Sequence, residues 1–148
     1  MLVNLDIVYK FLETVGITQE NRTVNRDGID FAKATRLLSP DFIILNPLFH
    51  PRHGLIERVG NSADGALSGP AGWVEDIKAT APYFSFSVSD FALHDASDVT
   101  ILRATIRIRG VRTGRTVETP FTELFFVKDG LIRRIEPYFN LNALHGII

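Results

Sequence analysis

Apolar and polar residues alternate almost without a break from Phe84 to Tyr138. Alternation with a period of two is typical of β-strands that are buried on one face. Short turns divide the alternation into four runs, YFSFSVSDFALHD, VTILRATIRIRG, RTVETPFTELFFV and LIRRIEPY. Four such runs in succession predict an antiparallel meander. The residues that we expect on its inner side are Phe84, Phe86, Val88, Ile106, Phe121 and Phe125.

One face of the third run is apolar except at two positions; it holds Val117, Thr119, Phe121, Glu123, Phe125 and Val127. A carboxylate in such a row is costly to bury while it is ionised, so Glu123 must be paired, protonated or used in chemistry. We expect a mostly buried side chain whose pKa is raised mainly by desolvation. Glu123 is therefore the first candidate for acid–base catalysis. The structural alternative is an acid bonded to a backbone amide or to a histidine.

The first part of the chain predicts two helices and a short strand. Apolar residues at helical spacing indicate a first helix through Leu5, Val8, Leu12 and Val15. A second helix is expected to begin at Asp27 or Asp30, to include Leu38, and to be stopped at Pro40. A short buried strand is expected over residues 41–46.

The middle of the chain predicts a long connection and a third helix. Residues 48–69 are rich in Gly, His and Ser, which is typical of a loop. Pro70 suits the first turn of a helix that ends before Pro82, with Trp73 and Ile77 one turn apart on one face. Helices, a short strand, another helix and a meander form an α+β order.

Length and composition narrow the class of protein. At 148 residues the chain is expected to form a single domain, residues 1–148. The net charge is −1 and the basic residues form no long run, which argues against nucleic acid as a partner. Without cysteine there is no disulfide, thiolate nucleophile or cysteine-ligated metal. We expect a cytoplasmic protein with no membrane partner, because no segment has the length and apolarity of a signal or a membrane span.

Two histidines in the predicted connection, His50 and His53, are candidate catalytic bases near the mouth of a pocket. Histidine is the natural proton carrier near neutral pH, although a pair in a loop is also often exposed to solvent without a role. These histidines and one acid lack a recognisable spacing of metal ligands, so we expect no metal site and no cofactor. Asn46, just before the connection, is either a strand-end residue or an amide that orients a ligand.

The opposite face of the meander is rich in charge. Arg103, Arg107 and Arg109 alternate with apolar residues on the second run, and the adjoining runs offer Glu118 and Glu136 as cross-strand partners. Such a face is either a solvated surface, on which each ion pair is worth little, or an interface between two copies. We expect a homodimer that buries about 1,200 Å² or more in total and uses part of this outer face.

Four sequence features, in order, carry a family resemblance: the stretch ATAPYFSFSVSDF, TGR at the tip of a hairpin, the turn KDG followed by LIRRI, and the close PYFNLNAL. Together they resemble the SnoaL-like branch of the NTF2-like superfamily, which also holds ketosteroid isomerases, limonene epoxide hydrolases and polyketide cyclases. The resemblance covers residues 70–145 well and residues 5–54 loosely. It implies an α+β cone, in which a curved antiparallel sheet wraps around N-terminal helices and leaves an apolar pocket open at one end.

The resemblance also implies which isomerase groups this chain keeps. The general base of ketosteroid isomerases lies just before a proline at the end of the first strand, where this chain has Asn46. Their second acid is a protonated hydrogen-bond donor on the strand after the hairpin. Counted from the Gly-Arg of the hairpin it corresponds to Glu123, and counted from Pro120 it corresponds to Thr122. The apolar face favours Glu123.

The characteristic groups of the other families are mostly absent. The epoxide hydrolases use an Asp-Arg-Asp relay together with an Asn and a Tyr that hold the water. This chain keeps the Asn, but Ile44 stands at the Tyr. Ala104, Ile106 and Pro137 stand at the Arg and the two Asp positions, so the relay is missing. The acid that follows the last strand in polyketide cyclases is replaced by Asn140.

Three classes of function remain open. The first is an enzyme that uses general acid–base catalysis on an apolar, carbonyl-bearing or polycyclic small molecule, as an isomerase, cyclase or dehydratase. The second is a non-catalytic binding protein for such a molecule, and the third is a structural module; an epoxide hydrolase with an altered site is a further alternative. We favour the enzyme, with Glu123 as the acid and His50 or His53 as the base. The residues expected to contact substrate are Asn46, Trp73, Ile106, Thr119, Phe121, Phe125 and Phe139.

Overall fold

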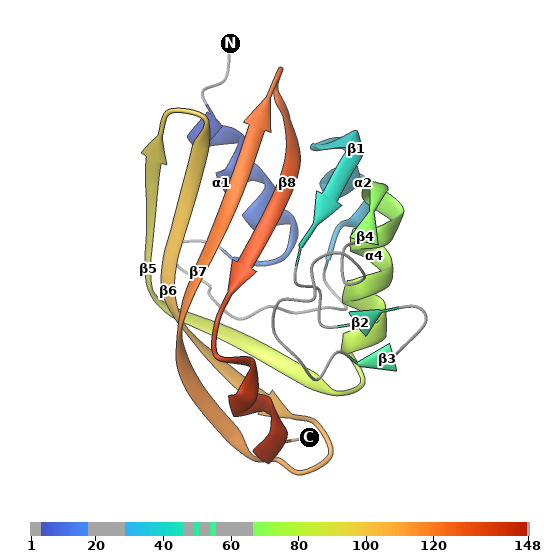
Figure 1. Ribbon diagram of the computed structural model, residues 1–148, viewed down its shortest axis with the longest axis vertical. Coiled ribbons are helices and arrows are strands. Elements are labelled where there is room, and N and C mark those ends of the chain that lie inside the picture. The colour runs from blue at the N-terminus through green and yellow to red at the C-terminus, as the bar shows by residue number, and fades with distance from the viewer. Residues whose placement is uncertain (1–3, 18–28, 46–48, 51–53, 56–66, 148) are drawn as a thin grey trace.

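The computed structural model describes residues 4–17, 29–45, 49–50, 54–55 and 67–147. The elements in chain order are α1 (Asn4–Thr14), α2 (Phe31–Arg36), β1 (Leu38–Ile44), β2 (Phe49–His50), β3 (Gly54–Leu55), β4 (Leu67–Ser68), α4 (Gly69–Thr80), β5 (Phe84–Ala96), β6 (Val99–Gly110), β7 (Thr116–Lys128), β8 (Leu131–Tyr138) and the 3-10 helix η2 (Leu141–Gly146). Six strands form one sheet in the order β4-β1-β8-β7-β6-β5, and β2 pairs with β3. Helix α1 lies along one face of this curved sheet, and α4 lies beside β1 (Figure 1).

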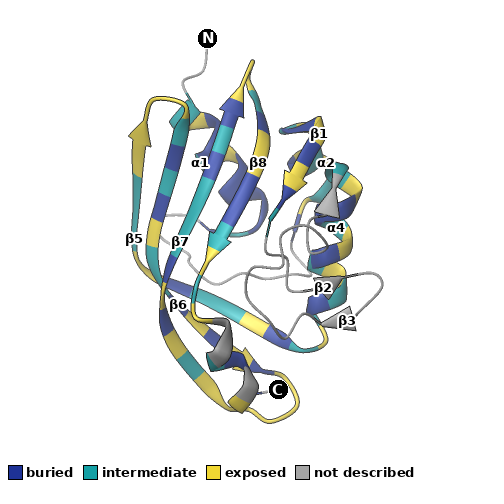
Figure 2. Cartoon of the chain, viewed as in Figure 1, coloured by how far each residue is buried: buried dark blue, intermediate teal, exposed yellow. Residues whose placement is uncertain are grey.

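The predicted meander is confirmed. Strands β5 to β8 pair antiparallel with their neighbours in sequence, and buried and exposed residues alternate along β6 and β7 (Figure 2). The six residues expected on the inner side are buried, except that Phe86 is half-buried. Asp129 and Gly130 join β7 to β8 with positive φ angles of 54° and 78°, which is the conformation of a tight type I′ hairpin.

Strand β1 adds a parallel neighbour to the antiparallel meander, so the whole sheet is mixed. It pairs with β8 through Leu38↔Ile132 and Ile44↔Ile135. A parallel neighbour requires a crossover connection. The chain supplies it by passing through α4 and the first three strands of the meander before it returns in β8.

The second helix is shorter than predicted. Asp30 caps it, because its side chain accepts a hydrogen bond from the backbone N–H of Lys33 (3.0 Å). The helix has six residues, and Leu38, which we expected inside it, begins β1 instead. Pro40 therefore lies in the strand, within the stretch where the register against β8 shifts. An irregular stretch tolerates proline because it lacks a continuous hydrogen-bond ladder.

The third predicted helix is confirmed as α4, which ends at Thr80, before Pro82. The predicted connection over 48–69 includes three strands of two residues each. Two of them, β2 and β3, pair with each other, and β4 pairs antiparallel with the end of β1. Gly69, at the end of the predicted connection, already begins α4, and residues 48, 51–53 and 56–66 lie outside the described residues.

A β-bulge bends β5. Its register with β6 shifts between Ser89 and Ala92, and Asp90 has a positive φ of 52°. A bulge adds one residue to one strand and increases the local bend and twist. The extra residue also changes the parity of the positions that pack against the core, which are Phe84, Phe86 and Val88 before it and Phe91 and Leu93 after it.

The core lies between α1 and the inner face of the sheet. Helix α1 buries Ile7, Val8, Phe11 and Leu12. The ring of Phe11 lies 6.1 Å from that of Phe125 on β7, between centroids. Within the described ranges, no helix is long and apolar enough to cross a membrane.

The segment after β8 packs on the far end of the β6–β7 hairpin. The Oγ1 of Thr113 donates a hydrogen bond to the carbonyl oxygen of Ile147 (2.7 Å), and the guanidinium of Arg115 donates to that of Gly146 (3.2 Å). Gly110 lies so close to this segment that a Cβ there would collide with the carbonyl oxygen of Ile147. The close approach therefore requires glycine.

Candidate functional site

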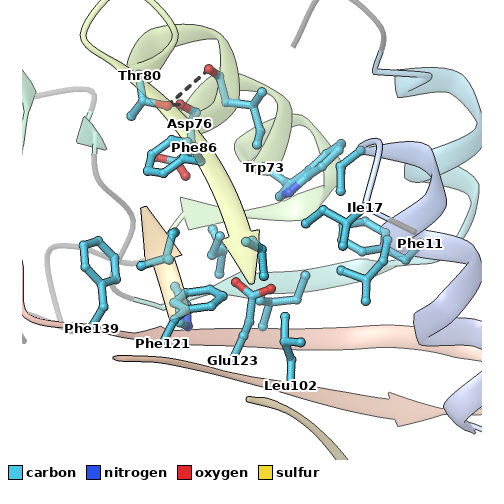
Figure 3. Close-up of a pocket in the computed structure, with 18 residues that line it drawn as sticks. Phe11, Ile17, Trp73, Asp76, Thr80, Phe86, Leu102, Phe121, Glu123 and Phe139 are labelled. Atoms are coloured by element: carbon cyan, nitrogen blue, oxygen red, sulfur yellow. Dashed lines mark hydrogen bonds between the residues drawn. The ribbon is translucent and has the colours of Figure 1, made fainter. Parts of the chain in front are cut away.

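An apolar cavity lies between α1, α4 and the inner face of the sheet. Its volume is about 160 Å³. An engineered protein cavity of roughly 150 Å³ binds benzene, so the space suits a ring-sized ligand. The lining comes from α1, β1, α4 and the four strands of the meander, and among the described lining residues only Asp76, Thr80 and Glu123 are polar. Figure 3 shows these side chains around the cavity.

Five predicted site residues line this cavity: Trp73, Ile106, Phe121, Glu123 and Phe139. They come from α4, β6, β7 and the segment after β8, so the fold brings together residues that are far apart in the sequence. The rings of Phe121 and Phe139 lie 6.2 Å apart and form part of one wall.

Two predicted site residues lie in the core instead of on the cavity wall. Phe125 is fully buried against Phe11 of helix α1. Thr119 is 6% exposed, and its Oγ1 donates to the carbonyl oxygen of Pro120 (3.3 Å). Both share a face of β7 with Glu123, but only part of that face borders the cavity, because α1 covers Phe125.

Three further predicted site residues are Asn46, His50 and His53. Asn46 and His53 lie outside the described residues, and His50 is described only by its backbone, which pairs with Gly54 between β2 and β3. Their roles stay predictions. Over the part of the chain that the structure describes, no group of three or more His, Asp or Glu residues could hold a metal ion.

An aromatic cluster holds α4 against the rest of the core. Trp73 is 3% exposed, and its ring lies 5.2 Å from that of Phe11 and 5.8 Å from that of Phe31. The Nζ of Lys78 lies 5.3 Å from the centre of the Phe31 ring. Tilted and edge-on ring pairs stabilise a core beyond their buried area. These contacts fix which face of α4 points into the cavity.

Two polar lining residues, Asp76 and Thr80, were not predicted from the sequence. With Trp73 and Ile77 they fall at positions i, i+3, i+4 and i+7, which form a single stripe on a helix. Asp76 is 8% exposed and Thr80 is 2% exposed. The Oγ1 of Thr80 donates to the backbone carbonyl oxygen of Asp76 (2.9 Å) (Figure 3). An acid on this stripe is the signal that could have found the site from the sequence.

Glu123 stands on the sheet side of the cavity. The register of β7 places it between Leu102 on β6 and Pro137 on β8, which also line the cavity. Its side chain is half-buried. Burial, and after it the negative charge of Asp76, raises the pKa of Glu123 from 4.5 to about 8. The carboxyl group is therefore mostly protonated at neutral pH and can donate a hydrogen bond or a proton.

The curved sheet, the helices packed inside it and the cavity between them define the NTF2-like class of fold, and solved structures agree. An NTF2-like protein of unknown function from Burkholderia pseudomallei K96243 has a TM-score of 0.73 at 16% identity, with 100% of this chain and 98% of that chain covered. A proposed polyketide cyclase from Pseudomonas putida KT2440 has a TM-score of 0.73 at 15% identity, with 100% of each chain covered. TerC, co-crystallised with polyporic acid, has a TM-score of 0.68 at 18% identity, with 97% and 96% covered. At these identities the likeness shows the fold alone.

The family follows from the sequence match. Residues 20–135 match the SnoaL-like domain family. Because this match spans most of the chain, the protein belongs to the SnoaL-like family, and the resemblance seen in its motifs is confirmed. No curated protein matches the sequence significantly.

Proposed function

We propose that the protein is a small enzyme of the isomerase or cyclase type, which uses acid–base catalysis on an uncharged, apolar molecule with a carbonyl group. The observation that carries this proposal is Glu123, a carboxyl group that is protonated near neutral pH on an otherwise apolar wall. Enolisation, aldol closure and dehydration need an oxygen stabilised at one atom while a proton leaves another. A neutral carboxyl group suits the first role, because it donates to the carbonyl oxygen without adding a negative charge.

The relatives support a small organic ligand. Among the structural neighbours, one is a proposed polyketide cyclase and another, TerC, was co-crystallised with polyporic acid. Membership in the SnoaL-like family supports the same type of activity. The ligand class itself comes from the lining, which favours an apolar molecule about the size of a ring system. The prediction that His50 or His53 supplies a base from the mouth of the cavity remains open.

Two alternatives have less support. A non-catalytic binding protein would use the same apolar lining and the hydrogen bond from Glu123, but it would not need the second ionisable side chain, that of Asp76, on the cavity wall. The epoxide hydrolase relay would need acids at Ile106 and Pro137. Both residues line the cavity and neither can carry a proton, so we do not propose that reaction.

The fluorescence of Trp73 tests the ligand-binding half of this proposal, because it is the only tryptophan in the chain and it lines the cavity. We expect the ketone 2-tetralone to change the emission in a saturable way. The hydrocarbon tetralin, which has the same rings without the oxygen, is the matched control ligand. Glu123→Leu, which has no hydrogen-bond donor in its side chain, should weaken the binding of 2-tetralone more than that of tetralin. Equal effects on the two ligands would show that Glu123 does not contact the carbonyl oxygen.

We also propose that two copies pair through the outer face of the sheet. Ile43 and Tyr138 are 38% and 46% exposed on that face. Between them Arg134 stacks on the ring of Phe126 (4.1 Å to the centroid) and pairs with Glu136 (3.7 Å). Light scattering at high micromolar concentration should give the mass of a dimer, and Tyr138→Glu should shift it toward the monomer. A monomeric wild-type protein would overturn this proposal.

A further inference from the structure

Glu123 can fill only one of the two roles that the proposed reaction requires. As a protonated carboxyl group it donates to an oxygen, so a second group must remove the proton from carbon. Among the described lining residues, those from α1, β1, β5, β6 and β8 are all apolar. Helix α4 adds a hydroxyl group at Thr80 and one further ionisable side chain, that of Asp76.

We propose that Asp76 is the base of this site, acting from α4 on the same bound ketone to which Glu123 donates from β7. This inference rests on the proposed function, because it assigns the second half of that reaction. The resemblance assigns no role to this position. The acids that it aligns lie on the strands of the sheet or directly after them, whereas Asp76 lies on a helix.

The packing of α4 holds Asp76 on the cavity wall. Asp76 shares a helical stripe with Trp73, which the rings of Phe11 and Phe31 fix in place. Figure 3 shows Asp76 on the helix side of the cavity and Glu123 on the sheet side, with the carboxyl group of Glu123 pointing into the space between them. A ring-sized ligand in this space lies between the two carboxyl groups.

The electrostatic interaction between the two carboxyl groups indicates which one donates a proton and which one accepts it. Two carboxyl groups that share an apolar cavity do not both ionise at low cost. Asp76 acts on Glu123 as a negative charge, which adds to the effect of burial in raising the pKa of Glu123. Because Glu123 holds its proton near neutral pH and can donate it, Asp76 is the carboxyl group left to accept one. An anionic ligand would bring a second negative charge beside Asp76, so the site favours uncharged ketones.

The proton transfers balance within the site. Asp76 takes a proton from the carbon next to the carbonyl group, and the electron pair of that C–H bond forms a carbon–carbon double bond. The π electron pair of the carbonyl group takes the proton of Glu123, which gives an enol, a neutral Asp76 and an ionised Glu123. The net charge of the site is unchanged. Return of a proton from Asp76 to carbon, and of the enol proton to Glu123, completes an exchange or an isomerisation.

Exchange of the α-hydrogens of 2-tetralone in D₂O, followed by proton NMR, tests this assignment. The two test variants are Asp76→Asn and Glu123→Gln. The matched control is Glu75→Gln, because Glu75 is the exposed neighbour of Asp76 on the same helix. The fluorescence of Trp73 measures ligand occupancy in parallel. We expect Asp76→Asn to slow the exchange by about 10²-fold or more at saturating ligand, and Glu75→Gln to leave the rate unchanged.

Two further measurements do not depend on the activity of the Asn variant. Carboxyl ¹³C NMR should show a lower apparent pKa for Glu123 in Asp76→Asn, because a nearby negative charge is removed. If circular dichroism shows that Asp76→Asn does not fold, Asp76→Ala replaces it. The Ala variant leaves space in which added formate should restore part of the exchange.

The outcomes separate the two proposals. If Asp76→Asn binds 2-tetralone and exchanges it at the wild-type rate while Glu123→Gln does not, the assignment of Asp76 fails and the proposed function stands. If the wild-type protein fails to bind 2-tetralone, or binds it without accelerating exchange, both proposals are overturned. Loss of exchange in Asp76→Asn, a lowered pKa of Glu123 and an unchanged Glu75→Gln control together support the assignment.

Discussion

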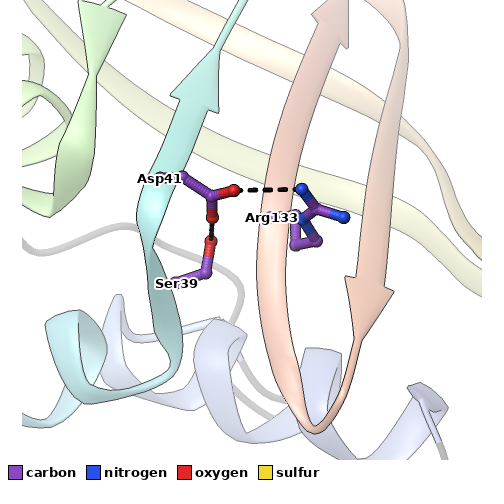
Figure 4. Close-up of polar contacts among 3 residues, drawn as sticks. All are labelled: Ser39, Asp41 and Arg133. Carbon is purple, nitrogen blue, oxygen red and sulfur yellow. Dashed lines mark hydrogen bonds and ion pairs between the residues drawn. The ribbon is translucent and has the colours of Figure 1, made fainter.

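Asp41 and Glu123 are carboxyl groups of the same sheet, and their surroundings move their pKa values in opposite directions. Asp41 lies at the exposed junction of β1 and β8, where it accepts a hydrogen bond from the Oγ of Ser39 (2.6 Å) and pairs with Arg133 (3.0 Å) (Figure 4). These contacts, that of Ser39 first, lower the pKa of Asp41. Glu123 faces the cavity instead, where burial and the charge of Asp76 raise its pKa to about 8.

The difference lies in what each position offers to the ionised form. Asp41 meets water, a hydroxyl group and a guanidinium group, so the folded state favours its charged form. Glu123 meets apolar side chains and a like charge, so the folded state favours its neutral form. An acid of the second kind lowers stability at neutral pH, and such acids cluster at functional sites.

The largest effect is expected from Glu123→Gln. The pKa of Glu123 is about 8 in the folded protein and about 4.5 when unfolded, so its carboxyl group destabilises the fold progressively as pH rises from 4.5 to 8. Glutamine does not titrate. Urea unfolding should give similar free energies for both proteins near pH 4, and a variant that is more stable by on the order of 3 kcal/mol at pH 7. A variant that is less stable at pH 7 would mean that Glu123 is ionised and paired in the fold.

A smaller effect is expected from Asp76→Asn. This variant removes the negative charge that helps to raise the pKa of Glu123, and it leaves the burial of Glu123 unchanged. The pKa of Glu123 should fall but stay above 4.5, because burial is the larger cause. The free energy of unfolding should then stop falling at a lower pH than in the wild-type protein. Urea unfolding across the same pH series measures this. If the free energy of unfolding stops falling at the same pH in the variant and in the wild-type protein, Asp76 and Glu123 do not interact.

Thr100 extends the comparison to an uncharged polar group on the inner face. It is fully buried, and its Oγ1 has no hydrogen-bond partner among the residues that the structure describes. Because a buried hydroxyl group without a partner is costly, we expect Thr100→Val to raise the free energy of unfolding by about 1 kcal/mol at every pH. Thr119→Val is the matched control, since the hydroxyl group of Thr119 donates to Pro120. A destabilised Thr100→Val variant would reveal a partner for this hydroxyl group.

The smallest effect is expected from Asp41→Asn, on the exposed side of the comparison. The acid has a lowered pKa, so its contribution to stability is present at neutral pH and is lost as pH falls through that pKa. The variant should be slightly less stable at neutral pH, and added salt should remove the difference, because the ion pair with Arg133 is exposed. If Asp41→Asn lost as much free energy of unfolding as Glu123→Gln gains, and salt did not change this loss, the exposed ion pair of Asp41 would matter as much as the buried acid.

The strands could be predicted closely because their signal is local. A slip of one residue would move a whole apolar row into solvent, so the alternation fixes the four meander strands. The bulge at Asp90 also leaves a trace in the sequence, because the apolar positions change from even to odd numbers between Val88 and Phe91. The start of β1 at Leu38 was missed because that residue also continues the helical pattern of α2.

The partner of Glu123 is harder to predict. The stripe that contains Asp76 is visible in the sequence, but the direction in which it points depends on how Trp73 packs against Phe11 and Phe31. A raised pKa that depends on two distant segments is a property of tertiary packing. The same holds for Phe125, which shares a face with Glu123 and is nevertheless covered by α1.

The contact between Gly110 and Ile147 connects a distant end of the sheet with the wall of the cavity. Any side chain at position 110 must push the segment that ends at Ile147 off the hairpin. Phe139, which forms part of the cavity wall, is joined to that segment through Asn140 alone. A substitution at Gly110 can therefore shift the part of the cavity wall that Phe139 forms while Glu123 and Asp76 keep their positions. Ligand choice and proton chemistry can in this way diverge separately among proteins that share this architecture.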